Sequence, residues 1–263
     1  MAEGQRTPDA VVVTGAGRGI GRAIAVALGT RGVPTLCIAR TSSAEATRDA
    51  IRSCGGLAEA LSVDLADHGA TERAVSLWIA ERPYRRLGVV LAAAELGPRG
   101  PLDASELDAW AHAFEVNVLG NLAVVRALLG RMLEGSAGRV VFLAGGGAGY
   151  AYPAFPAYAC TKAAVVRAAE NLHEDLRTRG DFAVVCLAPG AVETDMLRHV
   201  RAAGAEVRTT APVDDAVRFV EAFLFSPATT VSGRFLHARD TWAEAVAGAA
   251  KLPADHWKLR RVE

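Results

Sequence analysis

The stretch AVVVTGAGRGIG at residues 10–21 decides how the rest of the chain is interpreted. A short β-branched run leads into four glycines, and an apolar, alanine-rich segment follows at residues 23–28. This order predicts a strand, a tight turn and a helix. Because the first N–H groups of a helix lack partners, and glycines let the backbone approach a pyrophosphate closely, the turn is suited to a dinucleotide. The alternative is an ordinary strand-to-helix turn that binds nothing.

Apolar runs typical of buried strands alternate with helical patterns along the rest of the chain. Further strands are predicted at 34–39, 57–63, 88–93, 138–144, 182–188 and 233–238, and helices at 43–54, 67–82, 104–132, 155–179, 194–203 and 212–225. The alternation predicts an α/β fold, a single-domain Rossmann-like, doubly wound parallel sheet of about seven strands with helices on both faces. We expect a flexible N-terminus at 1–9, a domain at 10–240 with a substrate lid at about 194–212, and a C-terminal tail at 241–263.

Composition narrows the class of protein. The 29 basic and 29 acidic residues balance, so no net field favours nucleic acid or an anionic membrane. The four cysteines form no C-x-x-C pair, and we expect no metal site. No uninterrupted apolar run approaches the ~18 residues typical of a membrane span, and no signal peptide is recognisable. We therefore expect a cytoplasmic protein with no membrane partner.

Residues at the carboxyl ends of the predicted strands share one edge of the sheet, which is where such sheets bind ligands. Arg40 follows the second strand, where a side chain would meet the adenosine ribose, and Arg18 lies in the glycine turn. Two arginines there favour a 2′-phosphate and hence NADP over NAD, although both could simply be solvated. Asp64 could accept a hydrogen bond from the adenine amino group or could cap the helix at 67–82.

Tyr158 and Lys162 are the strongest catalytic candidates. Their spacing of four places both on one face of a predicted helix, so the phenol and the ammonium lie side by side. A nearby cation favours phenolate and would lower the pKa of the tyrosine towards working pH, as proton transfer requires.

These motifs together resemble those of the classical short-chain dehydrogenase/reductase family over residues 10–238. The similar segments are TGAGRGIG at 14–21, NVLG at 117–120, the Tyr158–Lys162 pair and PGAVET at 189–194. The resemblance implies hydride transfer between a nicotinamide cofactor and a carbonyl or alcohol of a small-molecule substrate, in a homodimer or homotetramer. It makes Tyr158 the proton donor or acceptor, Lys162 the residue that holds the nicotinamide ribose, and Asn117 the holder of a water that relays protons. The cofactor contacts then expected are Gly15, Arg18, Gly19, Ile20, Gly21, Arg40, Asp64, Leu65, Ala93, Lys162, Pro189, Gly190, Val192 and Thr194.

Two departures from that family's pattern stand out. The segment after the fourth strand is LAAA at 91–94 instead of N-N-A-G, and Gly145 occupies the position of the catalytic serine, 13 residues before Tyr158. Losing one oriented donor of this kind costs about 10²–10³ in rate. Tyr150 and Tyr152 carry the nearby hydroxyls that could replace it, or they could simply pack beside the neighbouring prolines.

The expected substrate contacts are therefore Gly145, Tyr150, Tyr152 and Arg198, the last from a basic lid that would suit an anionic substrate or would simply face solvent. The leading hypothesis is an NADP(H)-dependent oxidoreductase acting on a polar, perhaps anionic, substrate. The alternatives are an epimerase or isomerase that retains its cofactor, and a dinucleotide-binding pseudoenzyme, which the glycine at 145 favours.

Overall fold

The computed structural model describes residues 7–145, 147–205, 207, 210–227 and 229–260. Parts of the predicted N-terminus, lid and C-terminal tail, namely residues 1–6, 206, 208–209 and 261–263, lie outside the described residues.

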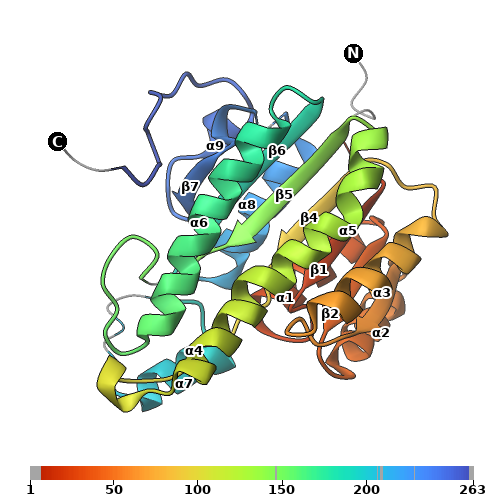
Figure 1. The fold of residues 1–263 in the computed structure, drawn as a ribbon. Coiled ribbons are helices and arrows are strands. Elements are labelled where there is room, and N and C mark those ends of the chain that lie inside the picture. The colour runs from red at the N-terminus through yellow and green to blue at the C-terminus, as the bar shows by residue number, and fades with distance from the viewer. Residues whose placement is uncertain (1–6, 146, 206, 208–209, 228, 261–263) are drawn as a thin grey trace.

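The described strands form one parallel sheet in the order β3-β2-β1-β4-β5-β6-β7 (Figure 1). Every neighbouring pair is parallel, and in the centre Thr14 is in register with Leu91. The chain therefore leaves β1 towards β2 on one side and continues at β4 on the other, which opens a crevice at their carboxyl ends. The bounds are β1 (Ala10–Thr14), β2 (Thr35–Ala39), β3 (Ala58–Ser62), β4 (Leu87–Leu91), β5 (Ala137–Leu143), β6 (Asp181–Ala188) and β7 (Arg234–His237).

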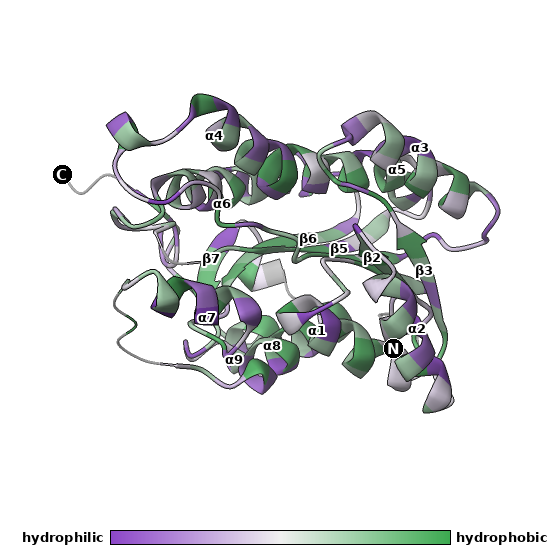
Figure 2. Cartoon of the chain, turned by 90° about the horizontal axis from the view of Figure 1, so that it is seen from below, coloured by the Kyte–Doolittle hydropathy of each residue, from purple (hydrophilic) through white to green (hydrophobic). Residues whose placement is uncertain are grey.

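Helices cover both faces of this sheet (Figure 2). One layer contains α1 (Gly19–Thr30), α2 (Ser43–Ser53), α8 (Val213–Phe225) and the short α9 (Ala243–Val246), and the other contains α3 (His68–Ala80), α4 (Leu107–Phe114), α5 (Asn121–Glu134) and α6 (Pro156–Leu176). A separate buried apolar cluster lies on each side of the sheet. Because both faces are covered, every residue of β1, β4 and β5 is buried, which explains why these strands are apolar runs in the sequence. The predicted doubly wound parallel sheet is confirmed.

The predicted helix at 104–132 differs from the structure in one important respect. After a 3₁₀ turn, η2 (Leu102–Ala104), the helix α4 passes through a π-helical turn, η3 (Glu115–Gly120), before α5 begins. A Cβ on Gly120 would come within 3.0 Å of the Leu65 carbonyl oxygen, so only glycine permits this close approach. The turn places Asn117 against the carboxyl edge of the sheet, and such turns are frequent at functional sites.

The continuous helical stretch Leu107–Glu134 is long and apolar enough to cross a membrane by length and composition alone. Half of its most apolar window is buried inside the protein. Its buried residues, including Val124, Val125 and Leu128, belong to the apolar cluster on one face of the sheet. This stretch thus has the environment of a core helix.

Candidate active site

The glycine-rich turn forms one wall of a cavity at the carboxyl edge of the sheet. Gly15 and Gly19 adopt φ of 64° and 55°, which favours glycine, and a Cβ on Gly15 would lie 2.8 Å from the Ala93 backbone. Arg18 precedes α1 but its side chain makes no capping bond, so it leaves the first N–H groups of this helix available. The backbone of the turn therefore offers donors to an anion beside β4.

The cavity has a volume of about 1470 Å³ and brings together most of the predicted site. Asn117 and Arg198 do not line it. The predicted residues that do are Gly15, Arg18, Gly19, Ile20, Gly21, Arg40, Asp64, Leu65, Ala93, Gly145, Tyr150, Tyr152, Tyr158, Lys162, Pro189, Gly190, Val192 and Thr194.

One end of the cavity is cationic and rich in hydroxyl groups. Arg40 is exposed there, and its guanidinium has no ion-pair or hydrogen-bond partner among the described residues. Thr41 and Ser43, whose hydroxyl oxygens lie 3.1 Å apart, line the same end and were missed by sequence reasoning. Arg18 also lines the cavity and forms an ion pair with Asp195, with 3.8 Å between Nη1 and Oδ2. This end suits a phosphate group.

Asp64 lies at the same end and is not the cap of the following helix. Asp67 caps α3, because its Oδ1 accepts from the Ala70 N–H at 2.8 Å. Asp64 instead accepts from the Ala66 N–H at 3.0 Å and lines the cavity. Of its two predicted roles, the capping role is therefore wrong.

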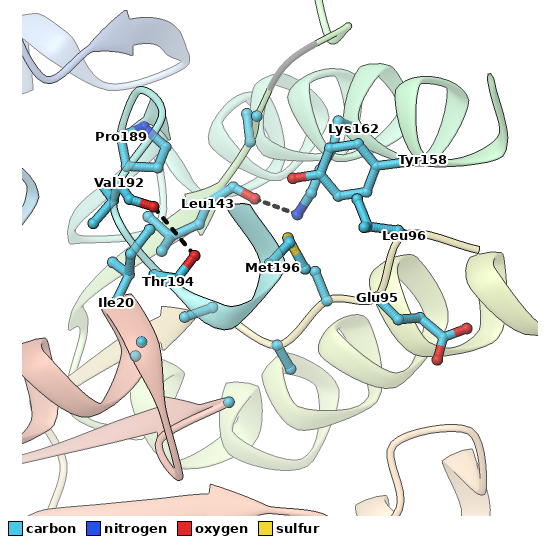
Figure 3. A pocket seen from close by; sticks show the side chains of 18 of the residues that line it. Ile20, Glu95, Leu96, Leu143, Tyr158, Lys162, Pro189, Val192, Thr194 and Met196 are labelled. Atoms are coloured by element: carbon cyan, nitrogen blue, oxygen red, sulfur yellow. Dashed lines mark hydrogen bonds between the residues drawn. The ribbon is translucent and has the colours of Figure 1, made fainter. Parts of the chain in front are cut away.

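Tyr158 and Lys162 occupy the inner part of the cavity, one turn apart on α6 (Figure 3). Both are buried, and Lys162 Nζ donates a 2.8 Å hydrogen bond to the Leu143 carbonyl at the end of β5. Nζ lies 5.4 Å from the centre of the Tyr158 ring. The helix and the strand end together fix the ammonium beside the phenol.

Burial dominates the proton affinities of this pair. It lowers the pKa of Lys162 to about 8, because desolvation disfavours the ammonium. Burial also raises the pKa of the Tyr158 hydroxyl, and the nearby Tyr152 and Tyr150 add to this increase. The expectation that Lys162 lowers the pKa of Tyr158 is therefore wrong for the structure described, in which the phenol is protonated at neutral pH.

Gly145 lies directly against Tyr158. A Cβ at position 145 would come within 3.0 Å of the Tyr158 hydroxyl oxygen and 3.1 Å from its Cζ. The space that a serine side chain would occupy is therefore filled by the tyrosine hydroxyl. Tyr150 and Tyr152 line the cavity as predicted, and the Tyr152 ring packs 5.8 Å from that of Phe155.

Asn117 holds the backbone rather than pointing into the cavity. Its Oδ1 accepts from the Glu95 N–H at 2.8 Å, while Nδ2 donates to the Glu95 carbonyl at 2.9 Å and to Thr161 Oγ1 at 3.0 Å. Thr161 in turn donates to the Tyr158 carbonyl at 2.8 Å. Both amide hydrogens of Asn117 are thus used within the protein, and its side chain ties the segment after β4 to α6.

Asn121, one turn further on, was missed by sequence reasoning. Its Nδ2 donates to the carbonyls of Ala93 and Asn117, both at 3.1 Å, and its Oδ1 accepts from the Thr14 hydroxyl at 2.7 Å. Thr14 Oγ1 accepts from the N–H groups of Ala92 and Ala93 at 3.0 and 3.1 Å. These buried groups fasten the end of β4, where the alanines provide no side-chain amide. The signal was a second asparagine four residues after Asn117 in an otherwise apolar segment.

Arg198 is separate from the other predicted substrate residues. It lies on the exposed face of α7 (Asp195–Ala202), where it forms an ion pair with Asp195. Figure 3 shows Met196, from the same helix, on the cavity side. The solvated alternative therefore describes Arg198 better than a substrate contact.

A parallel sheet with a glycine turn, a phosphate-binding end and a buried Tyr–Lys pair defines a dinucleotide-binding α/β protein. The comparisons give the family: the short chain dehydrogenase model matches residues 9–205, and the chain belongs to this family. A short chain dehydrogenase of Pseudocercospora fijiensis (strain CIRAD86) is 35% identical over 196 residues, which are 74% of this chain but 63% of that protein. The match therefore covers less than two thirds of that relative's length.

Solved structures agree with this assignment. A candidate NAD(P)-dependent gluconate 5-dehydrogenase from Beutenbergia cavernae, with NADP bound at low occupancy, has a TM-score of 0.81 and 32% identity over 91% of this chain and 98% of that chain. A gluconate 5-dehydrogenase from Burkholderia cenocepacia J2315, in complex with NADP and tartrate, has a TM-score of 0.78 and 26% identity over 93% and 99% of the two chains.

Proposed function

We propose that this protein is an NADP(H)-dependent oxidoreductase that interconverts a carbonyl and an alcohol, with Tyr158 as its acid and base. The observation that carries the proposal is that the Tyr158–Lys162 pair lines the same cavity as the glycine turn and Arg40. A small-molecule substrate, a cytoplasmic location and a homodimer or homotetramer belong to the same proposal.

The residues present fit the cofactor. The uncapped start of α1 and the glycine turn would hold the pyrophosphate, since Gly15 and Gly19 adopt positive φ and the first N–H groups of the helix lack side-chain partners. Arg40, with Arg18, Thr41 and Ser43, would hold the 2′-phosphate. Asp64, Leu65 and Ala93 would border the adenine and ribose, and Pro189, Gly190, Val192 and Thr194 would border the nicotinamide. The NADP in the Beutenbergia and Burkholderia structures supports this choice.

When bound, NADPH would supply the hydride that reduces the carbonyl carbon. The proton comes from this chain. The Tyr158 O–H donates it to the carbonyl oxygen, which completes the alcohol, and the phenolate that remains regains a proton from solvent before the next turnover. Because burial keeps the Tyr158 pKa high, the phenol holds its proton at neutral pH, and this supports the reductive direction. Lys162, fixed by Leu143, would orient the nicotinamide ribose beside the phenol. Asn117 would keep the cavity wall at Glu95 in place.

The glycine at position 145 supports a second candidate function, that of a dinucleotide-binding pseudoenzyme. With no side chain at this position, a pseudoenzyme that binds the dinucleotide without turnover has a specific observation in its favour. The buried Tyr158 favours the enzyme, because a protein that only binds the dinucleotide needs no proton donor beside Lys162.

The test replaces Tyr158 by phenylalanine and measures NADPH oxidation with a panel of ketones, together with NADPH binding by fluorescence. We expect turnover to fall at least ~10²-fold while the NADPH dissociation constant changes little. Tyr84→Phe is the matched control, since Tyr84 packs on Trp78 away from the cavity. Turnover retained in Tyr158→Phe would remove Tyr158 from its role, and NADPH binding without turnover of any ketone by the unmodified protein would favour the pseudoenzyme.

A further inference from the structure

The substrate side of the cavity differs in chemistry from its cofactor side. We infer that the substrate is a hydrophobic ketone or aldehyde, whose carbonyl is attached to an apolar body, rather than a sugar acid or phosphate ester. This inference rests on the proposed function and names the substrate class for the same site.

The first observation is a wall of apolar side chains around Tyr158. Phe155, Tyr158, Val200 and Ala203 form a buried cluster, and further partly buried apolar residues pack against it. We call the cavity-lining members of this group the apolar wall: Ala94, Leu96, Tyr152, Ala154, Met196, Val200, Ala205 and Val207. Val200 is buried and the other members are partly exposed, and all of them line the same cavity as the Tyr158 phenol. A hydrophobic ligand bound there would remove this apolar surface from water.

The second observation is the orientation of α7. Met196 and Val200 are one turn apart on this helix and both line the cavity, together with Leu197. Arg198, His199 and Arg201 are exposed on the other face. Arg198 pairs with Asp195, and Arg201 Nη1 lies 2.7 Å from Glu193 Oε2. The helix thus turns its apolar face to the substrate and its charges to solvent.

The third observation concerns three charged residues that line the cavity within the described part of the chain, Lys162, Glu95 and Arg239. Lys162 Nζ is committed to the Leu143 carbonyl, and the Glu95 side chain points away from Tyr158 towards His112, with 3.6 Å between Oε2 and Nε2 (Figure 3). Arg239 lines the cavity from the end of β7 and donates to the Thr210 carbonyl. The apolar wall itself offers only the Tyr152 hydroxyl to a polar substrate. A carboxylate or several hydroxyls placed there would lose their hydrogen bonds to water without replacement.

The substrate class that we infer for this chain differs from that of two solved relatives. The Beutenbergia and Burkholderia proteins are described as gluconate 5-dehydrogenases, whose substrate is a polyhydroxy acid. Their NADP supports the cofactor of this chain, whereas the apolar wall points to a different substrate class.

The experiment compares two carbonyl compounds under saturating NADPH, 2-tetralone as the hydrophobic probe and 5-keto-D-gluconate as the polar one. We expect kcat/KM for 2-tetralone to be at least ~100-fold higher, because the carboxylate and hydroxyls of the polar probe would lose their hydrogen bonds to water against apolar side chains. Val200→Asn should raise KM for 2-tetralone about 10-fold with a smaller change in kcat. His199→Asn is the matched control on the exposed face of the same helix and should change neither value.

Binding without turnover distinguishes this inference from the proposed function. Tyr158→Phe loaded with NADP⁺ should still bind 2-tetralone saturably by calorimetry, and adding Val200→Asn should weaken that binding. Preference for 5-keto-D-gluconate would overturn the inference and leave the oxidoreductase intact. Absence of saturable 2-tetralone binding would also overturn it. Saturable binding of 2-tetralone without reduction by the unmodified protein would support the apolar site while removing the proposed activity.

Discussion

Introducing serine at Gly145 is expected to damage the site rather than restore it. The resemblance to the family implies a serine at this position, so Gly145→Ser at first promises a missing hydrogen-bond donor. In the structure, however, any Cβ there lies within 3.0 Å of the Tyr158 hydroxyl oxygen, a separation that real Cβ atoms essentially never show. Ordinary van der Waals contact begins at 3.4 Å, so the phenol must move.

The size of the effect follows from that displacement. Restoring normal contact shifts the Tyr158 oxygen by roughly 1 Å, and a shift of this size in a proton-transfer group costs about 10²-fold in rate. An added hydroxyl donor could return up to about 10²–10³-fold if it reached the substrate oxygen. That return requires the new hydroxyl and the displaced phenol to reach the same substrate oxygen. Because Tyr158 is buried and its carbonyl accepts a hydrogen bond from Thr161, α6 has little freedom to bring both into place, so we expect the loss to dominate.

The assay measures kcat and the NADPH dissociation constant for the unmodified protein, Gly145→Ala and Gly145→Ser. The alanine variant carries the clash without the hydroxyl, so it isolates the steric term. We expect both variants to lose about 10²-fold in kcat with little change in NADPH binding. A Gly145→Ser protein that is faster than the unmodified one would refute the steric reasoning. A serine variant far faster than the alanine variant would show that the missing donor had been limiting.

Three further predictions follow from the same geometry. Arg40→Ala should weaken NADPH binding about 10- to 100-fold and leave NADH binding nearly unchanged, because one charge-assisted contact contributes about 1.5–3 kcal/mol. Equal losses of affinity for both cofactors in a titration would exclude a contact between Arg40 and the 2′-phosphate. Asn121→Leu leaves buried carbonyls and the Thr14 hydroxyl without their hydrogen-bond partner. The variant should lower the free energy of unfolding in urea by about 3 kcal/mol and raise KM for NADPH. A free energy of unfolding within ~0.5 kcal/mol of the unmodified protein would count against this network. Burial lowers the pKa of Lys162 to about 8. For the reduction, kcat/KM should therefore be at its maximum below pH 8 and should fall above pH 8, as the ammonium loses its proton. Lys162→Arg, whose side chain stays charged, should move that decline to higher pH, and an unmoved decline would assign it to another group.

Much of the fold could be predicted from the sequence because each buried strand is a short apolar run followed by a clear stop. The glycine turn at 14–21 placed α1 correctly, and strands such as β2 and β6 begin and end within a residue or so of their predicted bounds. The π-helical turn η3 could not be predicted in this way, because it depends on the close contact between Gly120 and Leu65, which are far apart in the chain. Periodicity alone reads the whole segment as one helix.

In the site, too, features set by local sequence could be predicted and features set by tertiary packing could not. Residues fixed by a local motif, such as Tyr158 and Lys162, lie where the spacing predicted, because i and i+4 share a helix face whatever surrounds them. Properties that depend on the surroundings were not accessible: the pKa of Tyr158 is set by burial, and the orientation of Arg198 by which face of α7 packs on the protein. Charged residues in a sequence do not show whether a helix face lines a cavity or faces solvent, because that depends on how the helix packs.

The two departures from the family pattern have opposite physical consequences. At the end of β4 the missing asparagines are replaced from other elements, since Thr14 and Asn121 bond the backbone of Ala93 from both sides. The end of β4 is thereby held by side chains from β1 and α5. At Gly145 the space left by the missing side chain is instead taken by the Tyr158 hydroxyl. Under the proposed function, Tyr158 would deliver its proton from this space, and the apolar wall beside it would bind the hydrophobic ketone that we infer.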